Sequence, residues 1–237
     1  MASTSTEERL REALDENIRL KEELEDIVYA VSHDVKSALR SVSSYSQLLI
    51  RQSPAGEQTS QYGKFIADGI GSAVAIVDRL NTFTRIYRSP PRTNIALKVI
   101  VQMTLLKLQQ QIRDSSAEIS CRELPEVSVN ESQFVLLFEN LIENALRYRG
   151  TAPPRVEISA EETDDGYLIS VADNGPGIEP RYHEFVFRPF KRLHGKDIPG
   201  TGLGLAMCSK IAAAHGGRIW VESDGRNGST FKIAVPF

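Results

Sequence analysis

A heptad pattern covers much of the first 90 residues and limits what this part of the chain can form. Apolar side chains recur in alternating steps of three and four residues from Leu10 to Leu49, with polar residues only at Asn17 and Lys21. This spacing keeps one apolar stripe along a single long helix and favours coiled-coil packing. The segment 52–56, which contains a proline and a glycine, is predicted to end that helix.

A second helix with the same spacing follows, from Tyr62 to Tyr87, and Ser89–Pro91 should end it. Two helices cannot enclose a core, whereas a second copy of the hairpin completes a four-helix bundle. We therefore expect a parallel homodimer through residues 1–89. The alternative is a monomer whose hairpin folds back onto its own C-terminal half. The heptads argue against it, because they begin well upstream of any second helix that could cover them.

From about Asn94 the chain changes to alternating strands and helices with frequent glycine, which is typical of an α+β domain. The boundary is expected at Pro90–Pro91. The predicted strands are Glu118–Arg122, Arg155–Ser159, Tyr167–Ala172, Gly217–Glu222 and Thr230–Val235. The predicted helices are Lys98–Arg113, Glu131–Arg149 and Gly202–Ala214.

Charge and composition exclude several classes of protein. The 28 basic and 31 acidic residues give a net charge of −3 and are spread through the sequence, so no surface for nucleic acid or acidic membrane is indicated. The apolar stretches are far shorter than the ~18 residues of a membrane span, and the N-terminus lacks a signal-peptide core, so a cytoplasmic location is expected. Cys121 and Cys208 lack the spacing of a zinc site, and both are predicted to be buried.

His33 lies on the first helix, roughly opposite the apolar stripe at 100° per residue, and its imidazole is predicted to face solvent. The carboxylate of Asp34 beside it suits a group that fixes the tautomer or accepts a proton and leaves the other ring nitrogen as a nucleophile. On its own, such a pair is more typical of a solvated helix surface.

The wider string around His33 resembles a phosphoacceptor motif. Residues Tyr29–Arg40 (YAVSHDVKSALR) are similar to the H box of the HisKA dimerisation and phosphoacceptor domain, especially in kinases linked to phytochrome-like or PAS sensors. The resemblance implies that His33 is phosphorylated and that Asp34 is its general base. The family usually has proline at Ala38, and often threonine or asparagine at Ser37. The Ser37 position orients water in members with phosphatase activity, which leaves that activity open.

Polar side chains follow one face of the predicted helix Glu131–Arg149. Asn140, Asn144, Arg147 and Tyr148 occupy positions i, i+4, i+7 and i+8, opposite an apolar stripe. An amide oxygen suits Mg²⁺, an arginine suits phosphate, and a tyrosine can lie against a base. The same mixture is also common on exposed helices, so both interpretations stay open.

Two glycine-rich segments add to this pattern. Asp173–Ile178 (DNGPGI) follows a predicted strand, and an ionised Asp173 suits an exocyclic amine such as that of adenine, although the string is also an ordinary turn. Gly200–Leu205 (GTGLGL) leads into a helix whose free N–H groups attract phosphate. Neither segment has Rossmann or Walker spacing, so dinucleotide-binding and P-loop folds are disfavoured.

In order, these segments resemble the N box (Asn140–Tyr148), first glycine box (Asp173–Ile178), F box (Phe185–Phe190) and second glycine box (Gly200–Leu205) of the GHKL-type ATPase domain, with Gly225–Phe231 as the final glycine segment. The resemblance implies ATP as the nucleotide and Asn144 as the Mg²⁺ ligand. The implied nucleotide-binding residues are Asn140, Asn144, Arg147, Tyr148, Asp173, Gly175, Gly177, Ile178, Lys191, Arg192, Gly200, Thr201, Gly202, Leu203, Gly204, Leu205 and Thr230.

The resemblance also implies an architecture and a reaction. An α-helical hairpin, which forms a four-helix bundle and coiled coil on dimerisation, precedes an α+β sandwich ATP-binding domain. The implied ranges are 1–27 for a coiled-coil signalling helix, 28–89 for dimerisation and phosphotransfer, and 94–237 for ATP binding. Phe190–Pro199 looks like the mobile ATP lid. It contains Lys191 and Arg192, one of which would reach the terminal phosphate.

In the implied reaction His33 attacks the γ-phosphate of Mg-ATP, and the phosphoryl group then passes to an aspartate of a response regulator receiver domain. A second copy of the chain and an upstream sensor domain or sensory partner are also implied. One alternative is a GHKL ATPase of the topoisomerase, chaperone or mismatch-repair type, which the H box argues against. Another is a non-catalytic dimer scaffold, suggested by the unusual pair Ser37 and Ala38 and disfavoured by the intact glycine boxes.

Overall fold

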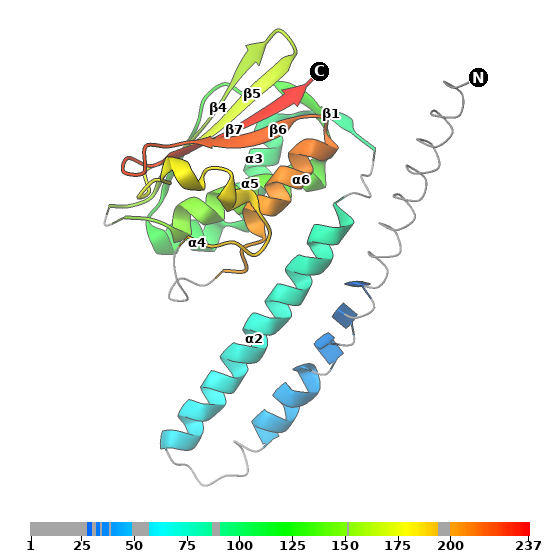
Figure 1. The fold of residues 1–237 in the computed structure, drawn as a ribbon, viewed down its shortest axis with the longest axis vertical. Helices are drawn as coiled ribbons and strands as arrows, with labels where there is room; N and C mark the ends of the chain where they lie inside the picture. The colour runs from blue at the N-terminus through cyan, green and yellow to red at the C-terminus, as the bar shows by residue number, and fades with distance from the viewer. Residues whose placement is uncertain are drawn as a thin grey trace, which may run out of the picture. The chain divides into compact units, whose positions relative to one another are not determined.

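The computed structural model describes residues 28–29, 32–33, 35–37, 39–48, 57–86, 91–150, 152–193 and 200–237, with the backbone alone at 57–60 (Figure 1). The chain divides into two compact units between Arg85 and Ile86. The predicted coiled coil at 1–27, the residues Asp34 and Ala38 and the lid residues 194–199 lie outside the described ranges. No helix within the described ranges is long and apolar enough to cross a bilayer.

The first unit is helical. The described residues between 28 and 48 are in helical conformation, and α2 spans Glu57–Arg85. Arg85 places its guanidinium 5.9 Å from the centre of the Tyr29 ring, and Lys36 forms an ion pair with Asp78. Each pair of residue numbers sums to the same value, which is the signature of two antiparallel helices in one register. The predicted hairpin is therefore present in the described residues.

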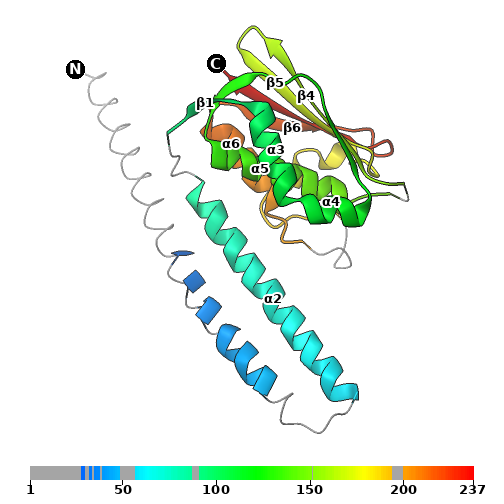
Figure 2. The same cartoon turned by 180° about the vertical axis from the view of Figure 1, so that it is seen from behind.

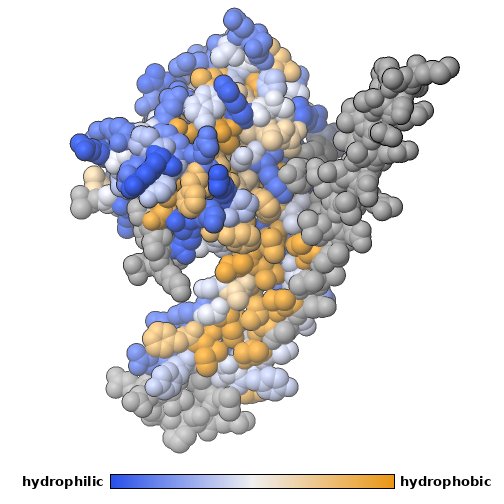
Figure 3. Space-filling model, viewed as in Figure 1, coloured by the Kyte–Doolittle hydropathy of each residue, from blue (hydrophilic) through white to orange (hydrophobic). Residues whose placement is uncertain are grey.

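Apolar side chains remain exposed along both helices of this unit, as Figure 3 shows for one face. The exposed large apolar residues of the predicted stripes are Val35, Val42, Tyr45, Tyr62, Ile66 and Ile76. A single hairpin thus leaves much of its heptad pattern uncovered.

The second unit is built on a five-stranded sheet of order β2-β4-β5-β7-β6, in which only β2 and β4 run parallel. The strands are β2 (Glu118–Cys121), β4 (Arg155–Thr163), β5 (Gly166–Asp173), β6 (Arg218–Glu222) and β7 (Ser229–Pro236). A separate antiparallel pair joins β1 (Thr93–Ala96) to β3 (Glu126–Val129). The sheet therefore brings the ends of β5, β6 and β7 together.

The helices cover one face of that sheet (Figures 1 and 2). They are α3 (Leu97–Lys107), α4 (Gln109–Ser115), α5 (Glu131–Arg147) and α6 (Gly204–Ala214), with short 3₁₀ turns at Pro180–Tyr182 and Phe185–Phe187. Alternate residues of β7, beginning with Ser229 and ending with Val235, are buried, as expected for a sheet covered on one side. The core between the layers contains Phe134, Phe138 and Ile233.

The sequence-based prediction differs from this fold in several details. The predicted helix Lys98–Arg113 is two helices that separate at Leu108, whose ψ of 4° departs from helical geometry. The strands β1 and β3, each four residues long, were not predicted. Cys208 is buried as predicted, but the prediction for Cys121 is wrong because that side chain is exposed on β2, the edge strand of the sheet.

Candidate nucleotide-binding site

The C-terminal half of α5 supplies the first wall of the candidate site. Asn130 caps the helix at its start, where its Oδ1 accepts a hydrogen bond from the backbone N–H of Gln133 at 3.1 Å. Near the other end, Asn144 and Arg147 are half-buried, and Arg147 forms an ion pair with Glu143 across one turn at 3.5 Å. The apolar stripe of α5 is buried against the sheet, so the polar face predicted from the spacing lies where a ligand could reach it.

Asn140 differs from the other residues of that face because it is only 4% exposed. Its Nδ2 donates to the carbonyl oxygen of Leu136 at 2.8 Å. A Cβ atom at Gly204 would lie 2.8 Å from Asn140 Oδ1, so the first residue of α6 rests directly against this amide. A side chain at position 204 would separate the two helices. The contact therefore joins the N box to the second glycine box.

Asp173, at the end of β5, is the main charged group of the site. Its Oδ1 accepts hydrogen bonds from the backbone N–H groups of Gly175 at 2.8 Å and Ser229 at 3.2 Å. Burial raises the pKa of Asp173 above its ordinary value, and these two N–H groups partly offset that rise. Its Oδ2 accepts no hydrogen bond from the residues that the structure describes, and this oxygen remains available to a donor on a ligand.

Close backbone contacts surround this carboxylate. A Cβ atom at Gly175 would lie 2.8 Å from the carbonyl oxygen of Tyr148, and one at Gly228 would lie 2.0 Å from the carbonyl oxygen of Asp173. Gly177 and Gly228 have φ angles of 80° and 81°, which favour glycine. The first glycine box, the end of the N box and the final glycine segment thus meet around Asp173.

The second glycine box ends at the start of α6, which has no side-chain cap. Its first N–H groups have no intrahelical partners and lie at the positive end of the helix dipole, which is the usual setting for a phosphate. Within the box, Leu203 is buried, Leu205 is half-buried, and the hydroxyl of Thr201 accepts from the Leu203 N–H at 3.3 Å.

Gly200 connects this segment to the N box. A Cβ atom at Gly200 would lie 3.5 Å from Arg147 Nη1 and 3.8 Å from the Tyr148 hydroxyl. The structure therefore places the ends of two sequence motifs, more than 50 residues apart in the chain, within van der Waals reach of each other.

Phe190 and Gly202 flank the predicted lid and are joined to each other. The backbone N–H of Phe190 donates to the carbonyl oxygen of Gly202 at 2.9 Å, and both residues have positive φ angles. Lys191 lies after this point, with its ammonium group 5.7 Å from the centre of the Phe185 ring, and Arg192 is half-buried. His194 and the following residues to Pro199 lie outside the described ranges.

The remaining predicted residues occupy different places. Thr230 is half-buried on β7 and pairs with Ala172, the residue before Asp173. It therefore lies near the same strand ends as the carboxylate. Ile178, at the end of the first glycine box, is half-buried. His33 and Ser37 belong to the first unit and are both exposed there, as predicted for His33.

Two residues of the site were missed by sequence reasoning. Ser229 contributes a backbone N–H to Asp173, and the Ser223 hydroxyl bonds to the first glycine box through Ile178. The glycines at positions 225 and 228 were a usable signal, because two closely spaced glycines with positive φ mark a loop that packs tightly against another backbone.

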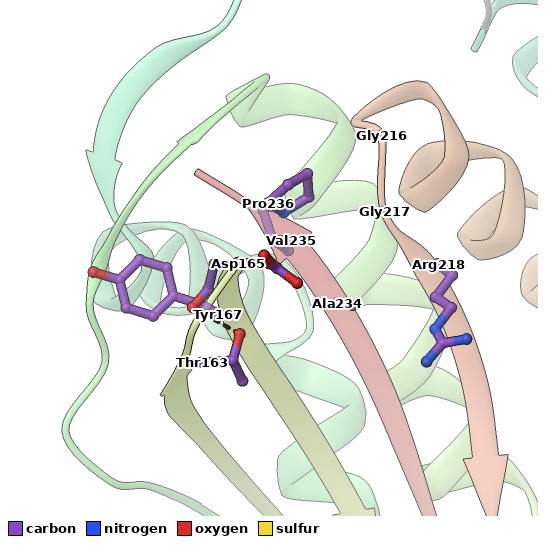
Figure 4. A pocket seen from close by; sticks show the side chains of 10 residues that line it. Thr163, Asp165, Tyr167, Gly216, Gly217, Arg218, Ala234, Val235 and Pro236 are labelled. Carbon is purple, nitrogen blue, oxygen red and sulfur yellow. Dashed lines mark hydrogen bonds between the residues drawn. The ribbon is translucent and has the colours of Figure 1, made fainter.

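A separate hollow of about 270 Å³ lies at the ends of β5, β6 and β7 that are opposite the candidate site (Figure 4). It is bounded by the turn from Thr163 to Tyr167, by Gly217 and Arg218, and by the end of β7. Gly166 and Asp173 are the two ends of β5, so about 24 Å separates this hollow from the carboxylate. It is therefore not part of the candidate nucleotide site.

Comparison with known proteins gives a family match and several relatives. Residues 129–237 match the family described as histidine kinase-, DNA gyrase B-, and HSP90-like ATPase. Phytochrome-like protein Cph1 of Synechocystis sp. is 35% identical over 224 residues, covering 92% of this chain and 30% of Cph1. Sensor histidine kinase ZraS of Escherichia coli is 28% identical over 240 residues, covering 96% of this chain and 49% of ZraS. The chain thus spans half or less of the length of these two relatives.

Two solved structures share the fold. Full-length ShkA in complex with AMPPNP matches with a TM-score of 0.70 and 23% identity, covering 90% of this chain and 46% of ShkA. Histidine kinase ThkA in complex with the response regulator protein TrrA matches with a TM-score of 0.63 and 21% identity, covering 89% of this chain and 61% of that chain. At these identities the likeness shows the fold alone.

Proposed function

We propose that this chain is the catalytic core of a sensor histidine kinase, because residues 129–237 match the histidine kinase-like ATPase family and the whole chain is similar to kinases of that kind. In this proposal it phosphorylates itself on His33 with ATP and passes the phosphoryl group to an aspartate of a response regulator. The observation that carries the proposal is the partly buried carboxylate of Asp173, which keeps one oxygen for a ligand where two glycine segments and the end of the N box meet. An exposed histidine on the helical hairpin of the same chain supplies the acceptor.

The site fits an adenine nucleotide. Oδ2 of Asp173 is suited to accept from the exocyclic amine of adenine, and the free N–H groups at the start of α6 suit the phosphates. Arg147 and Tyr148 border the same space near Gly200. The half-buried amide of Asn144 suits Mg²⁺, which would offset the negative charge of the phosphates when bound. Lys191 or Arg192 would serve the terminal phosphate from the lid.

The chemistry is a phosphoryl transfer to nitrogen. A ring nitrogen of His33 forms the new N–P bond, the bond from the γ-phosphorus to its bridging oxygen breaks, and ADP leaves. Asp34 holds the imidazole in the reactive tautomer and accepts its proton. The phosphohistidine formed is a reactive donor, which suits onward transfer to a carboxylate of another protein.

The uncovered heptads support dimerisation. The exposed residues Val35, Val42, Tyr62 and Ile66 are those that a second hairpin would bury. We assign residues 28–89 to a four-helix bundle formed by two chains, continued by a coiled coil over 1–27, and residues 94–237 to ATP binding. The response regulator would dock on this bundle. An upstream sensor domain supplies the signal that controls the kinase. The phytochrome-like relatives are longer than this chain, and their additional length could contain such a domain. ATP is supplied in the cytoplasm, where we place these domains.

The test is incubation of the purified chain with γ-labelled ATP. We expect an acid-labile, base-stable label that is lost in His33→Gln. Asn144→Ala and Asp173→Asn should abolish labelling and leave the dimer intact by light scattering, because neither residue belongs to the hairpin. Absence of label in the wild-type chain would refute the kinase and favour a scaffold that binds nucleotide without turnover. Normal labelling of Asn144→Ala or Asp173→Asn would show that the nucleotide site is misplaced.

A further inference from the structure

The hydroxyl group of Ser223 makes every hydrogen bond that a hydroxyl can make, and all of them lie beside the candidate site. It donates to the carbonyl oxygen of Gly228 at 2.6 Å and accepts from the N–H groups of Ile178 at 2.9 Å and Gly225 at 3.3 Å. A hydroxyl offers one donor and two acceptor sites, so its capacity is filled. Ser223 itself is half-buried just after β6, and its three hydrogen-bond partners are not among the groups proposed to bind the nucleotide phosphates.

These bonds connect two loops that are far apart in sequence. Ile178 ends the first glycine box, and Gly225 and Gly228 belong to the final glycine segment. The two loops also touch directly, because a Cβ atom at Gly177 would lie 2.6 Å from the backbone nitrogen of Arg226. Without the hydroxyl, two N–H groups and one carbonyl group lose their common partner, so Ser223 forms a hydrogen-bonded link between the two loops.

The connection extends to the carboxylate. Gly228 is followed by Ser229, whose N–H is one of the two groups that hold Asp173 Oδ1. Gly175, in the first glycine box, provides the other N–H. Each of the two loops that Ser223 joins thus contributes one donor to the same oxygen. A change in the separation of the loops therefore reorients the carboxylate and its second oxygen.

From this geometry we infer that Ser223 is a positioning residue for adenine recognition. It fixes the first glycine box against the final glycine segment and thereby sets the direction of Asp173 Oδ2. The inference rests on the proposed nucleotide site. It predicts that loss of the hydroxyl weakens recognition of the exocyclic amine and leaves the phosphate contacts at the start of α6 unchanged.

The test compares two ligands on the full chain. ATP and purine riboside triphosphate differ only in the exocyclic amine, so the ratio of their dissociation constants isolates that contact. A hydrogen bond to a charged group predicts a preference for ATP of about tenfold or more in the wild type. Ser223→Ala and Ser223→Cys should reduce the preference roughly three- to tenfold, mainly through weaker ATP binding. Ser223→Thr, which keeps the hydroxyl, should retain the wild-type preference for ATP.

Ser170→Ala is the matched control, because it removes a buried hydroxyl from the strand that ends at Asp173. It should leave the ratio unchanged. Equal weakening of both ligands by Ser223→Ala, or an unchanged ratio in Ser223→Cys, would overturn the positioning role even if Ser223→Ala fails to fold. A wild-type chain that binds neither triphosphate would instead overturn the proposed nucleotide site.

Discussion

Replacing His215 with leucine tests how the two central helices of the ATP-binding unit are held together. The side chain is 1% exposed, and its ring meets Phe134 edge-on with 5.0 Å between the ring centres. Nε2 lies 3.0 Å from the backbone nitrogen of Asn130 and accepts its N–H, and Nδ1 lies 2.7 Å from the carbonyl oxygen of Ile211. These partners fix the neutral tautomer with its proton on Nδ1. The imidazole thereby links the start of α5 to the end of α6.

The size of the effect follows from these contacts. Leucine fills much of the same space but leaves the N–H of Asn130 without its acceptor. A buried donor without a partner costs about 1–3 kcal/mol, and loss of the aromatic pair adds about 0.5–1.5 kcal/mol. We expect His215→Leu to lower the free energy of unfolding by about 2–4 kcal/mol at neutral pH. For a unit of this size, that lowers the unfolding midpoint by roughly 4–16 °C.

The cost should also depend on pH. Burial lowers the pKa of His215 below its ordinary value; the bond to Ile211 opposes this, and the nearby charge of Arg92 adds to it. Because the folded pKa lies below that of the unfolded chain, about 6.5, the unfolded chain binds more protons in mild acid. The contribution of the neutral imidazole is therefore complete above about pH 6.5 and is lost as the pH falls below it. Leucine does not titrate, so the stability difference between wild type and His215→Leu should shrink from pH 7.5 to pH 5.5.

The assay is urea unfolding of the full chain at several pH values, followed by the fluorescence of Trp220. This is the one tryptophan of the sequence, and it lies on β6 of the same unit. Groups that titrate identically in both proteins cancel in the difference. A His215→Leu difference that stays constant, or widens toward pH 5.5, would refute the neutral imidazole link.

Two further predictions concern the walls of the site. Because burial raises the pKa of Asp173, the charged carboxylate destabilises the folded state above its folded pKa. Asp173→Asn should therefore raise the unfolding midpoint at pH 7 while it abolishes ATP binding. The gain in stability should become smaller as the pH is lowered toward pH 4. Thermal unfolding and ATP titration measure the two effects, and a lower midpoint at pH 7 would contradict the first. Gly228→Ala places a Cβ atom 2.0 Å from the carbonyl oxygen of Asp173, at a backbone φ of 81°. It should destabilise the fold by about 1–3 kcal/mol and weaken ATP binding at least tenfold. Gly150→Ala is the control, because open space surrounds Gly150, and it should change neither quantity.

Sequence periodicity predicted the elements whose burial follows a simple rule. The stripe of α5 and the alternation of β7 are both visible in the sequence because each element buries one face and leaves the other more exposed. The break at Leu108 has no such signal, since neither glycine nor proline occurs between Leu97 and Ser115. The helix changes direction there because of what α3 and α4 each pack against, and that information lies elsewhere in the chain.

The site shows the same division. Asp173 and its glycines stand out in the sequence because charge and backbone freedom are properties of residue type. The contributions of Ser223 and Ser229 do not stand out, because one acts through a hydroxyl shared by two loops and the other through a backbone N–H. Any residue except proline provides that N–H, so its role depends on the register of β7 against β5 and not on composition.

The N box shows what helical spacing alone leaves undetermined. Asn140 and Asn144 are one turn apart on the same face of α5, yet the first is 4% exposed and the second is half-buried. The difference arises from α6, whose first residue, Gly204, lies against Oδ1 of Asn140 and covers it. Spacing therefore predicts which side chains share a face, whereas the neighbouring element decides how far each one can reach a ligand. Since that neighbour is the helix start with the free N–H groups, a displacement of α6 would move the phosphate site and uncover Asn140 at the same time.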